Sequence, residues 1–184
     1  MTAASLFHIA ASPMNPQSVS RRLATAFVEA YRRAHPADTI DTLDVWDADL
    51  PDVDSVAVSA RNKRLAGERQ TAEEAERWTA MVAVIARFDA AGKVLLSCPL
   101  WTSTMPSPLR NYLDVLIQGF HGGTRSRERR PLQLILTRTT KSAAAGTDLR
   151  VIFESLGFTD VRSLLGGSDH RRSLMGAKAA GAAF

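Results

Sequence analysis

The sequence has little of several features on which particular functions depend. It contains one cysteine, Cys98, so no disulfide can form within the chain, and a cytoplasmic setting is expected. No run of about 18 apolar residues is present, so we expect no membrane-spanning helix. The opening residues MTAASLFHIAASP carry no basic segment ahead of their short apolar stretch, which favours a first strand over a signal peptide.

Motifs for metal-dependent, nucleophilic and phosphate-loop chemistry are also missing. Without HExxH, CxxC or GxSxG, neither a metal site nor a protein nucleophile is expected. Without GxGxxG or GxxxxGK[ST], the dinucleotide fingerprint and the Walker loop are excluded. The net charge of +4 is compatible with an anionic ligand. Because aromatic residues are not interleaved among the arginines, no nucleic-acid partner is expected.

What the chain does contain is an alternation of short apolar runs with helical patterns. Its 184 residues, 45% of them hydrophobic, predict a single domain over 1–184. The periodicity predicts strands at 6–11, 39–46, 93–99, 132–137 and 161–165. It predicts helices that start at 19 and 71, helices over 108–119 and 148–156, and a short alanine-rich helix near the end. The polar segment 47–66 is predicted to be a long connection.

Strands that alternate with helices predict βαβ units and a parallel sheet. Five strands in a chain of this length favour a flavodoxin-like α/β fold, a doubly wound five-stranded parallel sheet of order 2-1-3-4-5 with helices on both faces. Ligands of such sheets bind beyond the carboxyl ends of the strands, at the switch point between the first and third strands. The loops after these two strands are therefore the expected site.

Three serines lie in the loop after the first strand. Ser12 closes the strand, and Ser18 and Ser20 bracket the start of the following helix. The free N–H groups and the positive dipole end of a helix, together with serine hydroxyls, favour an anion. The alternative is that Ser18 is simply a helix cap. Among phosphate ligands, a monophosphate such as that of FMN fits this loop best.

The stretch 97-SCPLWTSTMPSPLRNYLDVLIQG-119 joins the most hydrophobic strand to an amphipathic helix through a hydroxyl-rich turn. Such a turn can present backbone N–H groups to the edge of a flat ring, and Trp101 can pack nearby. The alternative for Trp101 is a place in the core. Tyr112, Leu113 and Leu116 are expected in the core or at a dimer interface, and Cys98 as a small buried hydrophobe.

Three segments resemble the FMN-dependent NADH azoreductase family, which belongs with the flavodoxin-like NAD(P)H:quinone oxidoreductases. They are 12-SPMNPQSVSRRLATAFVEAY-31, 39-TIDTLDVWDADLP-51, and the pair 99-PLWTS-103 and 109-LRNYLD-114. The resemblance covers most of residues 1–120. It implies an FMN enzyme that uses NADH or NADPH to reduce a quinone or an azo compound, by ping-pong hydride transfer through flavin N5. It also implies a homodimer with the flavin site at the interface.

The resemblance implies FMN-binding residues in three loops. For the phosphate these are Ser12, Ser18 and Ser20, and for the ring and ribityl chain Pro99, Leu100, Trp101, Thr102 and Ser103. After the fourth strand they are Thr137, Arg138, Thr139 and Thr140. Trp101 and His121 are candidate substrate contacts. No catalytic protein residue is expected, because the flavin carries the chemistry.

The sequence departs from the family around the expected substrate pocket. Where the family has a glycine-rich loop, this chain has 137-TRTTKSAAAG-146, and the arginine-rich segment 118-QGFHGGTRSRERRPL-132 is shortened. Arg138 or Lys141 near the flavin N1/O2 edge would stabilise an anionic reduced flavin, and a solvated basic loop is the alternative. Two other functions therefore stay open. One is a specialised biosynthetic flavin reductase with a dedicated substrate, and the other is a flavodoxin-like binding protein that has lost FMN.

Overall fold

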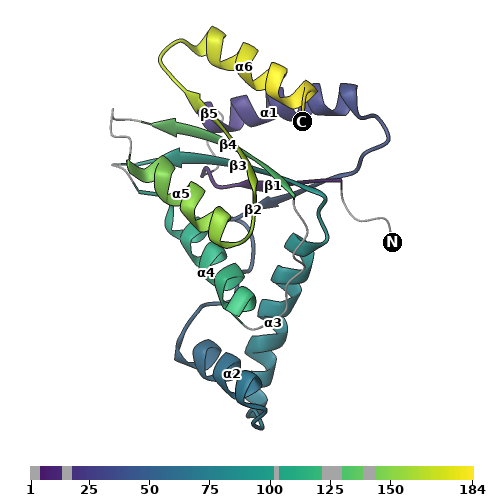
Figure 1. Ribbon diagram of the computed structural model, residues 1–184. Helices are drawn as coiled ribbons and strands as arrows, with labels where there is room; N and C mark the ends of the chain where they lie inside the picture. Colours follow the sequence, from purple (N-terminus) through teal and green to yellow (C-terminus); the bar gives the residue numbers. More distant parts are fainter. Residues whose placement is uncertain (1–4, 14–17, 102–103, 122–129, 139–143) are drawn as a thin grey trace.

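A single sheet of parallel strands organises the part of the chain that the structure describes (Figure 1). The computed structural model describes residues 5–13, 18–101, 104–121, 130–138 and 144–184. The strands are β1 (Leu6–Ala10), β2 (Ile40–Asp44), β3 (Lys93–Leu100), β4 (Pro131–Arg138) and β5 (Asp160–Gly166). They pair in the order β2-β1-β3-β4-β5, and every pair is parallel, which confirms the predicted topology.

Helices cover both faces of this sheet (Figure 1). They are α1 (Val19–Ala34), α2 (Ser55–Ala66), α3 (Ala72–Asp89), α4 (Ser107–His121), α5 (Ala144–Ser155) and α6 (His170–Ala182). On one face α1 and α6 pack over Leu6, Leu95 and Ile135. On the other face, the larger cluster gathers side chains of α3, α4 and α5. Within the described residues, no helix is long and apolar enough to cross a membrane.

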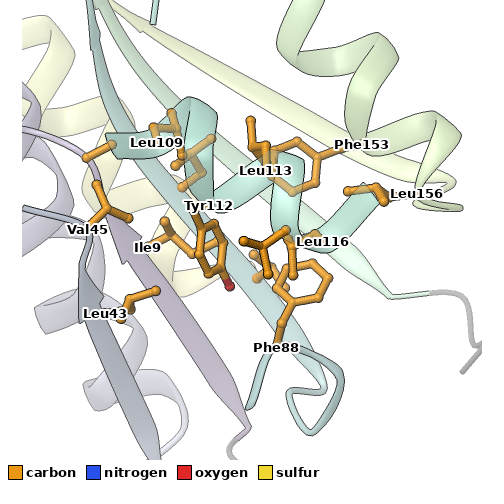
Figure 2. Close-up of a cluster of buried hydrophobic side chains, with 14 of the residues drawn as sticks. Ile9, Leu43, Val45, Phe88, Leu109, Tyr112, Leu113, Leu116, Phe153 and Leu156 are labelled. Carbon is orange, nitrogen blue, oxygen red and sulfur yellow. The ribbon is translucent and has the colours of Figure 1, made fainter. Parts of the chain in front are cut away.

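The apolar stripe that the sequence predicts for α4 faces the core. Tyr112, Leu113 and Leu116 are buried in the larger cluster, where Figure 2 places them against residues of the sheet and of α3 and α5. These three side chains therefore belong to the core of the chain itself. Cys98 lies in the same cluster, as expected for a small hydrophobe. Burial raises the pKa of its thiol to about 12, so the thiol is neutral near pH 7.

The prediction that 47–66 is only a long connection is wrong, because α2 occupies its second half. The Asp54 carboxylate caps this helix by accepting the Ala57 N–H at 2.9 Å, and Gly67 ends it at a left-handed φ of 71°. Of its residues only Ala57 and Ala60 are buried. An apolar stripe made of two alanines gives no helical period, although both ends carry ordinary capping residues.

The next helix starts as its capping box predicts. The Thr71 hydroxyl accepts the Glu74 N–H at 3.2 Å, and the Glu74 carboxylate accepts the Thr71 N–H at 2.7 Å. Lys63 and Ser59 of α2 also donate to that carboxylate, at 2.8 and 2.6 Å. One acidic side chain therefore joins the end of α2 to the start of α3.

Candidate functional site

The three serines predicted for the anion site come together where β1 runs into α1. The Ser12 and Ser18 hydroxyl oxygens are 2.7 Å apart, and those of Ser18 and Ser20 are 3.2 Å apart. Ser12 and Ser20 are 3% and 0% exposed. Ser18 is also the cap of α1, since its hydroxyl accepts the Arg21 N–H at 3.4 Å. The cap therefore forms part of a larger hydroxyl cluster at the positive end of a helix.

Arg21 fixes this cluster in a way that the local sequence pattern did not indicate. Its guanidinium donates twice to the Ser12 carbonyl oxygen, from Nε at 3.1 Å and from Nη2 at 2.7 Å. It also forms an ion pair with Asp44 at the end of β2. Arg21 and Asp44 meet because β2 lies beside β1. The ion pair ties the first loop to the neighbouring strand and places a cation beside the serine hydroxyls.

A histidine and a serine pair beneath the cluster, within the sheet. His8 of β1 and Ser97 of β3 share a hydrogen bond of 2.9 Å between Nε2 and the hydroxyl oxygen. Burial, and then the nearby Arg21 cation, lowers the pKa of His8 to about 4, although Asp44 acts in the opposite direction. The imidazole is therefore neutral near pH 7. No sequence pattern indicates this pair, because His8 lies within an apolar run.

The second predicted loop begins where β3 ends. Pro99 and Leu100 are the last residues of the strand, and the Leu100 side chain is buried in the core, so only its backbone can face a ligand. Trp101 is 39% exposed, so the alternative that placed it in the core is wrong. Its N–H and carbonyl exchange hydrogen bonds with Thr104 at 2.9 and 2.8 Å. Thr102 and Ser103 lie outside the described residues.

The third predicted loop lies next to the second. Thr137 of β4 is the register partner of Pro99, and Arg138 is that of Leu100, so the ends of β3 and β4 meet at the same edge. Arg138 ends the strand, while Thr139, Thr140 and Lys141 lie outside the described residues. His121 ends α4. The contacts expected of the Arg138 and His121 side chains stay predictions.

Trp46 is a further candidate site residue, which the sequence pattern did not indicate. It follows β2, and its indole N–H donates to the carbonyl oxygen of Ala11, directly before Ser12, at 3.1 Å. Its ring centroid is 6.2 Å from that of Trp101, with the two planes at 53°. In the sequence, Trp46 looks like the end of an alternating edge strand. Its position beside Trp101 follows only from the order of the strands.

Two cavities lie on the side of the sheet that α3 and α4 cover. One of about 200 Å³ lies between β1, β2, α3 and α4 and is lined in part by Phe7, Leu50 and Tyr112. The other, of about 630 Å³, lies between α3 and the segment after β2, and Asp49 and Arg77 help to line it. None of the predicted site residues lines either cavity. Among the described residues, no group of three or more His, Cys, Asp or Glu could hold a metal ion.

The fold defines a doubly wound, flavodoxin-like protein, with a cluster of serine hydroxyls and a helix N-terminus at its switch point. Residues 4–182 match the family described as having a flavodoxin-like fold. An FMN-dependent NADH:quinone oxidoreductase of Nitratidesulfovibrio vulgaris is 32% identical over 181 residues, 88% of this chain and 85% of that protein. The chain therefore belongs to this family with a flavodoxin-like fold.

Other comparisons agree with this assignment. The FMN-dependent NADH:quinone oxidoreductase of Desulfotalea psychrophila is 37% identical over 113 residues, which cover 61% of this chain and about half, 53%, of that relative. A crystal structure of an azoreductase from Bacillus anthracis superposes with a TM-score of 0.84 at 22% identity, covering 98% of this chain and all of the other. A B. anthracis FMN-dependent NADH-azoreductase in complex with FMN gives 0.82 at 20% identity, with 98% of each chain covered. These two structures share the fold.

Proposed function

We propose that this protein is an FMN-dependent oxidoreductase that uses NADH or NADPH to reduce quinones, azo compounds or both. The observation that carries the proposal is the cluster of Ser12, Ser18 and Ser20 hydroxyls at the start of α1, at the switch point of the sheet. The relatives named FMN-dependent NADH:quinone oxidoreductases support it. The proposal includes a single domain over 1–184, a cytoplasmic setting and a homodimer with the flavin site at its interface.

The residues present fit an FMN phosphate. Three hydroxyls that now bond to one another can turn to donate to phosphate oxygens, and the first N–H groups of α1 add donors at the positive helix end. Arg21 occupies the Ser12 carbonyl oxygen, and Asp44 balances its charge, so the attraction for a phosphate comes from the hydroxyls and the helix end.

The ends of β3 and β4 provide the second half of the proposed site. Pro99, Leu100 and Thr137 offer backbone groups at one edge, and Trp101 adds an exposed ring. We propose that Thr102, Ser103, Arg138, Thr139 and Thr140 complete the contacts to the flavin. His121 is proposed as a substrate contact.

The bound flavin would take two electrons from NAD(P)H and deliver them to the acceptor. In balance, NAD(P)H, a proton and a quinone give NAD(P)⁺ and a hydroquinone. Reduction of an azo bond to two amines needs two equivalents of NAD(P)H and two protons. The reductant and the acceptor use one site in turn, so that oxidised nicotinamide leaves before the acceptor binds.

The absorption spectrum of the purified protein tests the proposal first, followed by NADH consumption with a quinone. A flavin spectrum and quinone-dependent turnover are expected. A colourless protein that cannot be loaded with FMN would contradict the proposal and favour a binding protein that has lost FMN. A yellow protein that no quinone or azo compound reoxidises would instead indicate a reductase with a dedicated substrate.

Substitution of the hydroxyl cluster tests the residues. We expect Ser18→Ala with Ser20→Ala to weaken FMN binding by roughly 1.5–3 kcal/mol for each lost hydrogen bond to the charged phosphate. Equilibrium unfolding of the apoprotein separates this effect from the loss of the helix cap, which costs about 1 kcal/mol. Ser155→Ala, on the exposed end of α5, is the matched control. Unchanged FMN affinity in the double variant would show that the phosphate lies elsewhere.

A further inference from the structure

Two of the three tryptophans lie in contact at the molecular surface. Trp46 and Trp101 are 38% and 39% exposed, whereas Trp78 is 4% exposed. Their ring centroids are 6.2 Å apart, within the range of favourable aromatic pairs. Burial of such rings is strongly favourable, so two neighbouring rings left partly open in the isolated chain leave a large apolar area available for a ligand.

Hydrogen bonds hold the Trp46 ring and the Trp101 backbone in place. The Trp46 indole N–H is bound to the Ala11 carbonyl oxygen, and its backbone N–H is bound to the Asp44 carboxylate at 3.1 Å. The Trp101 backbone is paired in both directions with Thr104. A ring that is fixed before a ligand arrives, as that of Trp46 is, loses little conformational entropy when the ligand binds.

The pair lies beside the hydroxyl cluster. Trp46 and Trp101 follow β2 and β3, the two strands that flank β1, and the end of β1 leads through Ala11 to Ser12. Asp44 connects the two features directly, because one carboxylate oxygen binds Arg21 and the other binds the Trp46 N–H. The aromatic pair therefore occupies the same edge of the sheet as the proposed cofactor site.

We propose that Trp46 and Trp101 together form an aromatic wall that binds the ring of the electron acceptor and selects fused two-ring quinones over single-ring quinones. The exposed parts of indole rings offer apolar area and π-faces without formal charge, which suits flat, uncharged and extended rings. A second fused ring covers more of the wall than one ring does. The selectivity rests on the proposed function, whereas the binding of a quinone to the wall does not.

Steady-state kinetics with naphthoquinone and benzoquinone test the selectivity. We expect Trp46→Ala to lower the ratio of kcat/KM for naphthoquinone to that for benzoquinone about 2- to 10-fold, the worth of one aromatic pair, mainly through KM. Trp46→Phe should restore most of the ratio. Met175→Ala, which removes an exposed apolar side chain of α6, is the control and should leave the ratio unchanged. Equal losses for both quinones would overturn the proposal.

Tryptophan emission supplies a readout that does not depend on turnover. In a Trp78→Phe background, only the two wall residues emit, and naphthoquinone should quench the apoprotein saturably. The quenching should weaken when Trp46 is also replaced by phenylalanine. Linear, unsaturable quenching would overturn the proposal, even in a protein that binds FMN and turns over. Saturable quenching in a protein that cannot be loaded with FMN would support the aromatic wall and refute the reductase.

Two further outcomes identify other occupants of the wall. If Trp46→Ala weakens FMN binding as much as it weakens naphthoquinone binding, Trp46 acts as a flavin contact and the proposal fails. If it changes the mass measured by sedimentation, a second copy of the chain covers the tryptophans, and the proposal also fails. Unchanged FMN affinity and mass, with the lowered quinone ratio, are the expected results.

Discussion

Gly181→Ala is expected to loosen the contact between α6 and α1. Gly181 lies in the last turn of α6, directly against the backbone of α1. A Cβ atom built at this position is 2.2 Å from the carbonyl oxygen of Phe27 and 2.9 Å from its carbonyl carbon. Both distances are shorter than any real Cβ contact, and a backbone inside a helix cannot rotate away.

The magnitude follows from two opposing effects. Alanine gains up to about 1 kcal/mol over glycine in helix propensity, and less near a helix end. Overpacking costs about 1–3 kcal/mol when neighbouring groups must move. Here α6 itself must shift, which disturbs the contact between the Phe184 and Phe27 rings, whose centroids are 5.6 Å apart. The cost less the gain leaves an expected net loss of up to about 3 kcal/mol of unfolding free energy.

Gly176→Ala is the matched control in the same helix. A Cβ atom there would approach only the Leu164 Cδ1 atom, at 3.1 Å, and this side-chain tip can turn aside. The control should be neutral or stabilising by up to about 1 kcal/mol. Equilibrium urea denaturation followed by circular dichroism compares the two variants. If Gly181→Ala were as stable as Gly176→Ala, the close approach of α6 to α1 would be refuted.

Two further predictions concern pH. The pKa of His8 is lowered from 6.5 to about 4, so the unfolded chain takes up this proton first and stability falls as the pH drops from about 6.5 to about 4. His8→Gln should remove that part of the slope of stability against pH, and an unchanged slope would argue against the lowered pKa of His8. The pKa of Glu74 is lowered from 4.5 to about 2, first by its hydrogen bond from Lys63. Its stabilising effect is therefore complete above about pH 4.5 and is lost as the pH falls to about 2. Urea titrations should show Glu74→Gln to be less stable than the natural chain at neutral pH. The difference in unfolding free energy should shrink as the pH falls from about 4.5 to about 2. A difference that stays constant over this pH range would contradict the lowered pKa of Glu74.

The sequence predicted the sheet because each strand carries its own signal. Apolar runs such as KVLLSCP mark buried parallel strands, and Thr71 with Glu74 marks a helix start within four residues. Helix α2 was not predicted because its buried side is made only of Ala57 and Ala60. Local patterns predict an element only where its apolar face is large enough to show a period.

Part of the candidate site could likewise be predicted from the sequence, and part could not. The gathering of Ser12, Ser18 and Ser20 was predictable, because they lie within nine residues of one another in a loop whose place in the fold follows from the topology. The His8–Ser97 pair joins residues 89 positions apart, and Arg21 and Asp44 are 23 apart. Such pairs depend on which strands become neighbours and on where each strand stops. No local spacing rule contains that information.

The two outer strands of the sheet have a consequence for how copies of this protein can associate. An edge strand exposes backbone groups that can pair with a strand of another molecule. Here Arg87 donates to the Thr42 carbonyl oxygen on β2 at 3.1 Å, and Arg150 donates to the Val161 carbonyl oxygen on β5 at 2.7 Å. Each arginine blocks an acceptor on its edge and leaves a charge that an incoming strand would have to desolvate. At these two points, pairing of the sheet edge with a strand of another molecule is therefore disfavoured.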